Sequence, residues 1–600
     1  MNVFRILMMV VIVGIGWSVA LSGCADKEAT TEAQETSEGG EETEPEATPQ
    51  LNFEERVEEE GSTFAPGNVL DVRVSISESD WNKLRFEHRD PVEFFGSGCH
   101  EQIPDVFNYY PVDVTMDGES IGQVGARTKG LVGSINPARP SLKLKLQEYQ
   151  EDLFYKERKR FTFNNQTTDA ARLSTCMAFY VYRKMGVPAS RCNFAHVHVN
   201  ENDMGIYANV EPIKKLMIQR LFGDDSGNLY EGTVSDIRTD FDVRVEKKTN
   251  EDESDWSDVQ RLKDALDSTD DDAIDQIAEL VDIDAFLAFT AASVMVGHWD
   301  SFSGNANNYY FYRDPTSDKF FFIPWGPDDT FSNENIADGG QIQAALGGAL
   351  LARRLLEDPS IMTRYRDTMR NLLQERWDDE EILGELDRME ALIAPHVAAT
   401  NEGFSGAVNS VREYIADRKR KLLNAVNADP IPFSGQLRDA PICMQVSGQL
   451  NVSFRGTWDT LGSDDPFGGG SGTMSASYGE FDFASESVAA MMGEVGSPGA
   501  TEIDLLALLG GTQALFYRLM LPTEALQPNS SFDMSDPRVS SLMVRVDLAT
   551  RTPQVMGFLG EGTFTFGDEV DLTPGGIVEG ELNAAIWGGF AEAYGSSEGD

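Results

Sequence analysis

The chain has 600 residues, and 99 acidic residues against 49 basic ones give it a formal net charge of −50. This length is enough for two or three domains. The acidic balance argues against nucleic acid and anionic membrane surfaces as partners, and any phosphate site needs a local cluster of Lys and Arg.

The first segment predicts export. Residues 6–20 are an apolar run that ends at Leu21-Ser22-Gly23-Cys24, a signal-peptide pattern too short for a stable membrane span. The tetrapeptide resembles the bacterial lipobox, which implies a signal peptide over 1–23 and lipid attachment at Cys24. Ala25, where Asp would retain the protein at the inner membrane, implies sorting to the outer membrane. Residues 24–65 are acidic and poor in apolar residues, which predicts a disordered tether.

The next part of the chain is predicted to be rich in strands. Alternating apolar and polar residues predict strands at 69–77, 109–118, 120–130, 141–147, 160–165, 193–200 and 205–211. One helix is expected over 169–186, with Asp169 as its N-cap or first-turn acid. The strict alternation of 141–147 places Lys143 and Lys145 on one face of their strand.

From about Ser254 the periodicity becomes helical. It predicts helices at 254–268, 271–280, 283–297, 340–356, 359–376, 379–399 and 405–427, interrupted by an aromatic hairpin of strands at 309–313 and 319–323. Beyond Asp429-Pro430, residues 436–600 contain short alternating runs and Gly-rich turns. We expect a separate β-rich accessory domain there, either a sandwich or a barrel.

One segment of the helical part has the residues of a catalytic site. Asp300 follows the apolar helix, Asn305 comes five positions later, and the aromatic hairpin leads to Asp328 and Asp329. A carboxylate and an amide in one loop, followed by a second acid beyond a hairpin, is the order in which kinase-like folds gather Mg²⁺ ligands and a catalytic base.

A family resemblance rests on pieces that follow one another in a fixed order. They are RTKG (127–130), PSLKLKL (140–146), NNQTTDAARL (164–173), NENDMGIYANVE (200–211), the Asp300–Tyr310 loop and IPWGPDDTF (323–331). Together they resemble the CotH (spore coat protein H) kinase family, in its exported bacterial branch, over residues 66–428. The resemblance implies an α+β, bilobal, protein-kinase-like fold with a β-rich N-lobe and a helical C-lobe. It also implies ATP and Mg²⁺ (or Mn²⁺) as cofactors.

The resemblance assigns roles around the catalytic loop. Asp300 is the expected base that orients and deprotonates the acceptor hydroxyl. Asp328 is the expected metal ligand together with Asn305, for which Asn307 and Asn308 are open alternatives. Gly326 stands where the family usually has its first acid, and Asp329 is the candidate to replace that carboxylate.

The phosphate side is assigned to the β-rich part. Lys145, preferred narrowly to Lys143, is expected to hold the α- and β-phosphates, with Arg127 and Lys129 as a basic cover. A kinase lysine is usually held by a helix carboxylate, but residues 169–186 contain no Glu. Glu211 is therefore the expected partner of the lysine.

The remaining Cys and His residues bear on structure. An exported chain with Cys99, Cys176, Cys192 and Cys443 is expected to form disulfides, with Cys176–Cys192 as one pair and free buried thiols as the alternative. His196 and His198 share a strand face as metal ligands do, but the sequence shows no third ligand, so a packed or exposed face is expected.

These observations predict an exported, monomeric, lipid-anchored atypical kinase that phosphorylates protein Ser/Thr or itself. Because ATP is scarce outside the cytoplasm, the alternative is a catalytically weak pseudokinase that acts as a cell-surface binding or adhesion module. Nucleotidyl transfer on the same fold is a third hypothesis. A protein substrate or surface partner is expected, with membrane contact only through Cys24.

Overall fold

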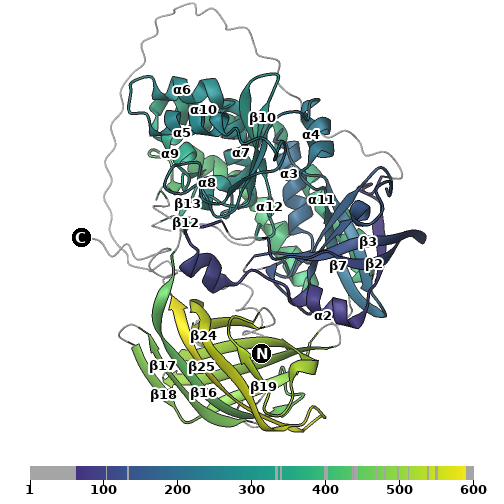
Figure 1. Ribbon diagram of the computed structural model, residues 1–600. Coiled ribbons are helices and arrows are strands. Elements are labelled where there is room, and N and C mark those ends of the chain that lie inside the picture. The colour runs from purple at the N-terminus through teal and green to yellow at the C-terminus, as the bar shows by residue number, and fades with distance from the viewer. Residues whose placement is uncertain are drawn as a thin grey trace, which may run out of the picture.

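The computed structural model describes residues 62–588 except 103–104, 132–133, 332–335, 338–340, 398–402, 435–436, 438–442, 464, 466, 468–469, 479–480, 496–498, 511–512, 537–538 and 548–551. The predicted signal peptide, Cys24 and nearly all of the tether therefore lie outside the described residues. Within the described part, no helix combines the length and apolar character needed to cross a bilayer. The chain folds into a mixed α/β structure with three successive regions, shown in Figure 1.

The first region is a closed barrel in the strand order β1-β2-β3-β4-β5-β7-β6. Its strands are β1 Val69–Ser75, β2 Tyr110–Met116, β3 Glu119–Lys129, β4 Ser141–Lys145, β5 Arg160–Asn164, β6 Cys192–Val199 and β7 Asn202–Val210. All seven predicted strands are present within a few residues of their expected bounds. The ring closes because β1 pairs antiparallel with β2 and parallel with β6, and inward apolar residues such as Val72, Leu144 and Val197 fill it.

Short helices accompany the barrel: α2 Glu78–Phe86, η1 Glu93–Ser97, η3 Leu146–Glu148, α3 Ser174–Lys184 and α4 Lys215–Phe222. The helix predicted over 169–186 begins later than expected, at Ser174. The Asp169 carboxylate still stabilises its start, since it accepts hydrogen bonds from the backbone N–H groups of Ser174 (2.7 Å) and Ala171 (2.9 Å). Helix α3 is buried almost throughout, and it packs against the helical region.

The second region combines a small sheet with helices. The sheet has the order β11-β10-β8-β9, built from β8 Leu229–Gly232, β9 Val245–Lys247, β10 Tyr309–Asp314 and β11 Lys319–Pro324. The helices are α5 Ser257–Asp267, α6 Ala273–Leu280, α7 Ile283–Val296, α8 Phe302–Asn305, α9 Leu350–Glu357, α10 Pro359–Asn371, η4 Leu372–Arg376, α11 Asp379–Ile393, η5 Ala394–His396 and α12 Phe404–Val426. The predicted aromatic hairpin is β10–β11, with Tyr310 opposite Ile323.

One helix prediction was too long. The helix expected over 340–356 begins only at Leu350, because the preceding residues form short strands that pair elsewhere. These strands are β12 Ile336–Ala337, β13 Gln341–Ile342 and β14 Ala345–Leu346, and the partner of the last is β15 Phe433–Ser434. Strand β14 pairs in parallel with β15, a partner almost 90 residues away, and such a pairing is invisible to local periodicity.

The C-terminal region is one continuous antiparallel-rich sheet of ten strands. They are β16 Gln445–Trp458, β17 Ser471–Tyr478, β18 Phe481–Ser485, β19 Val488–Glu494, β20 Ala500–Gly510, β21 Gln513–Pro522, β22 Ser531–Asp533, β23 Ser540–Asp547, β24 Thr552–Val570 and β25 Ile577–Gly588, with a short η6 Thr523–Ala525. The sequence left a sandwich and a barrel open. Strand β25 pairs with both β16 and β24, so the path through β19, β20, β21 and β23 returns on itself around an apolar core.

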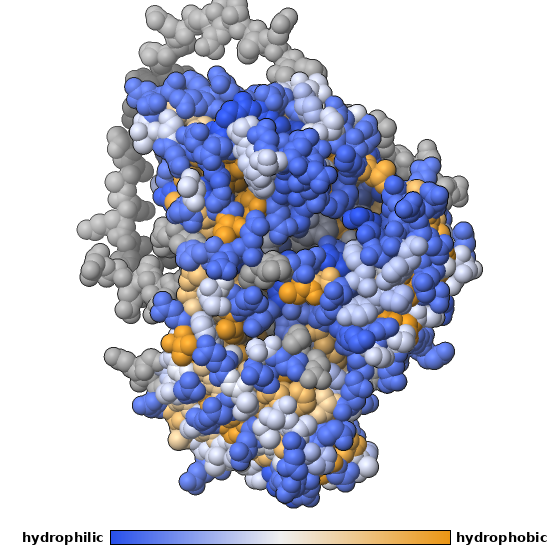
Figure 2. All heavy atoms as spheres, in the orientation of Figure 1, coloured by the Kyte–Doolittle hydropathy of each residue, from blue (hydrophilic) through white to orange (hydrophobic). Residues whose placement is uncertain are grey.

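Covalent and polar contacts join the regions. The disulfide Cys99–Cys443 links the segment after α2 to the start of the C-terminal sheet, and Asn82 of α2 donates to Glu524 at 3.1 Å. The second disulfide, Cys176–Cys192, ties α3 to β6 and confirms the expected pair. In Figure 1 the C-terminal sheet lies below the barrel and the helical region. The face in Figure 2 is mostly hydrophilic, with apolar residues in small groups.

Candidate functional site

Asp300 lies in the loop that follows α7, and three asparagine amides surround its carboxylate. The helix ends at Gly297, whose left-handed φ of 73° turns the chain back. Asn305 Nδ2 lies 2.6 Å from Asp300 Oδ1, Asn308 Nδ2 lies 2.7 Å from Oδ2, and Asn307 Nδ2 lies 3.2 and 3.1 Å from the two oxygens. All three asparagines left open by the sequence therefore converge on the same carboxylate.

His298 supports this loop from inside. It is buried, and its Nδ1 lies 2.9 Å from the hydroxyl of Tyr182 on α3. Burial lowers the pKa of His298 to about 3, so its ring is neutral at physiological pH. His298 thus joins the Asp300 loop to α3.

The turn after β11 brings Asp328 and Asp329 to the Asp300 loop. Asp328 is half-buried, and burial raises its pKa to about 6; Lys129 opposes the shift, while Asp329 and Asp300 add to it. The exposed Asp329 carboxylate accepts a hydrogen bond from Trp299 Nε1 at 2.8 Å. The two acidic segments singled out in the sequence are therefore neighbours in space.

Gly326 occupies a position that another residue would not easily take. Its φ is +52°, and a Cβ there would lie 2.6 Å from Asn308 Oδ1. Left-handed backbone favours glycine, and this approach is closer than van der Waals contact allows. The amide oxygen of Asn308 thus fills the space into which a side chain at position 326 would begin to extend.

A cluster of lysines faces these acids from the barrel. Burial lowers the pKa of Lys143 on β4 to about 7 and that of Lys129 on β3 to about 8, although Glu231 attracts both lysines and Asp328 also attracts Lys129. Glu231 forms an ion pair with Lys248 at 2.8 Å. Burial acts to raise the pKa of Glu231, but the attraction of Lys248 and Lys143 outweighs it and lowers the pKa to about 2.

Two other predicted phosphate ligands have partners of their own. Lys145 Nζ lies 2.5 Å from the Glu148 carboxylate and 5.4 Å from the centroid of the Tyr109 ring. Arg127 lies opposite Lys143 in the β3–β4 register, and its guanidinium is 2.5 Å from Asp105. The lysine that faces the acidic loop is therefore Lys129, and Lys143 lies beside it, whereas Lys145 is paired with Glu148.

Nearly all of these residues lie in a part of the chain that matches a known protein family. The family described as CotH kinase protein matches residues 126–422, which contain every one of the residues above except Asp105 and Tyr109. The chain belongs to the CotH family. Inner spore coat protein H of Bacillus subtilis is 23% identical over 282 residues, which are 43% of this chain and 76% of that protein. Invasin CotH7 of Rhizopus delemar is 21% identical over 364 residues, 55% of this chain and 60% of that protein.

Two solved structures resemble the chain at low TM-scores. The Helicobacter pylori proinflammatory kinase CtkA is 11% identical, and the match covers 48% of this chain and 89% of that one with a TM-score of 0.24. A chain of the Shewanella oneidensis HipA, HipB and operator DNA complex is 12% identical, with 62% and 76% covered and a TM-score of 0.25. TM-scores this low do not establish a shared fold.

Within the CotH domain, Glu211 has a different place from the one expected. Its carboxylate is fully buried and forms ion pairs with Arg191 (2.8 Å), Arg220 (2.6 Å) and Arg158 (3.2 Å). The expected pairing of Glu211 with the strand lysine is therefore replaced by a three-arginine cluster. The carboxylate that faces Lys143 is Glu231, which sequence reasoning missed; the only local signal is an acid in the short strand LYEG, which lies opposite Tyr310.

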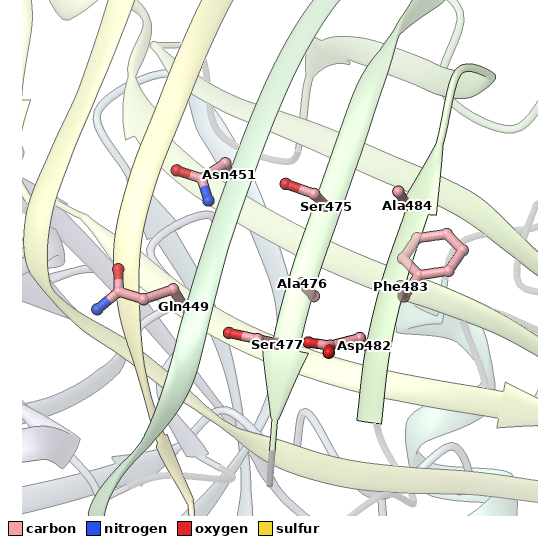
Figure 3. Close-up of a pocket in the computed structure, with 8 residues that line it drawn as sticks. All are labelled: Gln449, Asn451, Ser475, Ala476, Ser477, Asp482, Phe483 and Ala484. Carbon is pink, nitrogen blue, oxygen red and sulfur yellow. The ribbon is translucent and has the colours of Figure 1, made fainter. Parts of the chain in front are cut away.

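Hollows in the surface lie away from the CotH site. A shallow one of about 330 Å³ on β16–β18 is lined by Gln449, Asn451, Ser475, Ala476, Ser477, Asp482, Phe483 and Ala484, as Figure 3 shows. Another of about 350 Å³ lies beside α5 and is lined by Trp256, Lys263 and others. Neither of these two hollows is lined by Asp300, Asp328 or Lys143.

Proposed function

We propose that the CotH domain is an atypical, bilobal protein kinase that uses ATP and a divalent cation, Mg²⁺ or Mn²⁺, to phosphorylate a protein hydroxyl. The observation that carries the proposal is that Lys129 on the barrel faces Asp328, which neighbours Asp300 in the helical region, and that Lys143 lies beside Lys129. The family name and the order of the motifs support it.

The residues fit the cofactors. Asp328 supplies a carboxylate, and Asn305 and Asn308 supply amide oxygens beside the neighbouring Asp300; oxygen ligands of this kind suit Mg²⁺. When bound, the cation supplies neutralisation of phosphate charge. The Asn308 oxygen beside Gly326 takes the place of the missing family acid, with Asp329 as the other candidate. Lys143 and Lys129 are cations held at some cost by burial, so a bound polyanion stabilises their charged form.

Asp300 has the role of base in this mechanism. Its carboxylate already accepts several amide hydrogen bonds, which hold both oxygens in fixed positions. An acceptor hydroxyl that displaces one amide would be oriented by Asp300 and would transfer its proton to it. Catalysis would come mainly from positioning and charge neutralisation.

We also propose that this kinase is exported and anchored in the outer membrane by lipid on Cys24. The two disulfides support an oxidising compartment, where such bonds persist. The β-rich region after residue 436 would then be an accessory domain on the outside of the cell, and the protein would act as a monomer on a surface protein or on itself.

A second candidate function is a pseudokinase that binds a surface partner. Gly326, together with a relative named as an invasin, favours it. The alternatives separate when the full-length chain is incubated with ATP labelled on the γ-phosphate in the presence of Mg²⁺ or Mn²⁺. A kinase incorporates label, and Asp300→Ala lowers the rate by roughly 10²–10⁴-fold while metal-dependent ATP binding persists.

Asp328→Ala should abolish metal-dependent ATP binding, whereas Asp284→Ala, an exposed ion-pair residue of α7, should change nothing. Transfer of α-phosphate label, seen as a mass gain of AMP, would replace kinase activity by nucleotidyl transfer. If the wild-type chain shows no labelling and no metal-dependent ATP binding, the binding module is the function that remains.

A further inference from the structure

Three of the chain's six histidines gather at one junction of the fold. His196 and His198 lie on the barrel strand β6, and their ring centroids are 4.3 Å apart. His396 comes from η5, at the end of α11 in the helical region, and its Nδ1 lies 3.3 Å from Nδ1 of His196. The third ligand that the sequence did not show is thus supplied from 200 positions along the chain.

A carboxylate completes the cluster. Asp203 of β7 lies 2.8 Å from His196 Nε2, and its position is held by a hydrogen bond from the Gly205 N–H at 2.7 Å. One ligand atom from each of His196, His198 and Asp203 falls within 4.8 Å of the others. These three residues lie near a common centre, and His396 contacts the other nitrogen of the His196 ring, so a centre shared by all four residues requires that ring to turn.

The cluster is poorly explained as ordinary packing. His198 Nε2 is buried and has no hydrogen-bond partner among the described residues, and the Asp71 carboxylate is 3.9 Å away. Two imidazole Nδ1 atoms at 3.3 Å can share at most one proton. The same separation is expected for two nitrogen ligands of one tetrahedral Zn²⁺, because Zn–N distances are about 2.0–2.1 Å.

The donor set suits a metal. Neutral imidazole is the form that binds metals. Three imidazoles and one carboxylate match the preference of Zn²⁺ for nitrogen-rich tetrahedral sites, whereas Mg²⁺ and Ca²⁺ prefer sites made of oxygen.

We propose that His196, His198, Asp203 and His396 form a structural Zn²⁺ site that clamps the barrel to the helical region. The metal would connect strands β6 and β7 to the end of α11, beside the contact that Arg388 makes with the Pro66 carbonyl. With all four positions filled by side chains, the site is closed and has no open position for catalysis. Its effect would be on how the two regions are held, and it does not depend on the kinase assignment.

The test is a metal-binding measurement on the full-length chain, purified without a polyhistidine tag and stripped with EDTA. After dialysis against Zn²⁺, elemental analysis should find one Zn²⁺ per chain. His396→Ala and His198→Ala should each weaken Zn²⁺ binding at least about tenfold. His88→Ala is the matched control, because His88 lies outside the cluster and contacts the Phe86 carbonyl.

Two further readouts make the result decisive. Zn²⁺ should raise the Tm of the wild-type and His88→Ala chains but not that of His396→Ala, and Co²⁺ in its place should give the intense visible absorption of a four-coordinate site. If an alanine variant fails to fold, His396→Gln and His198→Gln replace it. Absence of stoichiometric Zn²⁺, or binding that is equal in wild-type and His396 variants, would overturn the proposal.

Discussion

Two glutamates in the CotH domain show how the same side chain takes opposite roles. Glu211, at the end of β7, is fully buried and bound by Arg158, Arg191 and Arg220. Glu231, on β8, is half-buried and faces Lys248 and Lys143. Arginine is permanently charged and forms rigid forked hydrogen bonds, so the Glu211 cluster has a structural role.

Lysine behaves differently. It is a flexible point charge whose pKa shifts readily on burial. Near Glu231, burial lowers the pKa of Lys143 to about 7 and that of Lys129 to about 8, whereas the ion pair with Glu231 raises the pKa of Lys248. An incoming anion stabilises the protonated form of lysines with lowered pKa values, whereas the arginines around Glu211 are charged without one. The comparison teaches that the kind of cation around a buried carboxylate separates a structural centre from a binding one.

The largest expected effect is on the free energy of unfolding, and it tests the structural role of Glu211. Glu211→Ala leaves three arginines without their carboxylate, and breaking a buried charge cluster in this way costs about 3–5 kcal/mol. Urea unfolding of the full-length chain followed by fluorescence measures the loss. Glu357→Ala removes a surface carboxylate paired with Arg353 and should cost less than about 1 kcal/mol. Equal costs for the two variants would contradict the structural role of Glu211.

The next effect tests the binding centre. Lys143→Ala should weaken ATP binding by about 1.5–3 kcal/mol, or roughly 10- to 100-fold, because a charged hydrogen-bond donor is lost. Lys145→Ala is the control, because Lys145 shares a strand face with Lys143 but is paired with Glu148. Calorimetric titration with Mg²⁺ and ATP compares them. A larger loss in Lys145→Ala would restore the assignment that the sequence favoured.

The pH dependence of ATP binding separates lysine from arginine. In the free protein Lys143 loses its proton as pH rises through about 7, whereas a lysine bound to phosphate keeps it. ATP affinity should therefore fall above pH 7, by up to about tenfold per pH unit. Lys143→Arg keeps its charge and should remove the fall near pH 7, which leaves only the fall through about pH 8 that Lys129 contributes. Identical profiles for the two chains would show that another group titrates.

The smallest effect concerns Glu231. Its charge raises the pKa of Lys143, so Glu231→Gln should move the fall in ATP affinity to lower pH and weaken binding at pH 7.5 a few-fold. Glu246→Gln is a matched control, because Glu246 also pairs with Lys248 but its side chain is more exposed than that of Glu231. An unchanged pH midpoint in Glu231→Gln would mean that Glu231 acts on Lys248 alone.

Much of the fold followed from local patterns. The seven barrel strands, the hairpin β10–β11 and helices such as α7 and α12 lie close to their predicted ranges, because two- and 3.6-residue periodicities are properties of short segments. The helix expected over 340–356 failed where short strands found distant partners. Helices α2 and α4 were missed because they are short, with eight or nine residues each.

In the candidate site, too, the contacts between residues close in the chain were predictable and the contacts between distant residues were not. Asp300, its asparagines and Asp328 lie within one segment joined by a hairpin, so their proximity was readable from chain order. The disulfide Cys176–Cys192, separated by 16 positions, was readable for the same reason. In contrast, the proximity of Glu231 to Lys143, the arginine partners of Glu211 and the contact of His396 with His196 all depend on residues far away in the chain.

The sequence by itself determined the acids and amides of the loop, the strand face with its lysines, and the family to which they belong. Only the tertiary structure decided that Glu231 faces Lys143, that three arginines enclose Glu211, and that His396 meets His196 across 200 positions. The physical reason is that charges and metal ligands act through distances of a few ångströms. Those distances are created by packing between elements that no local pattern brings together.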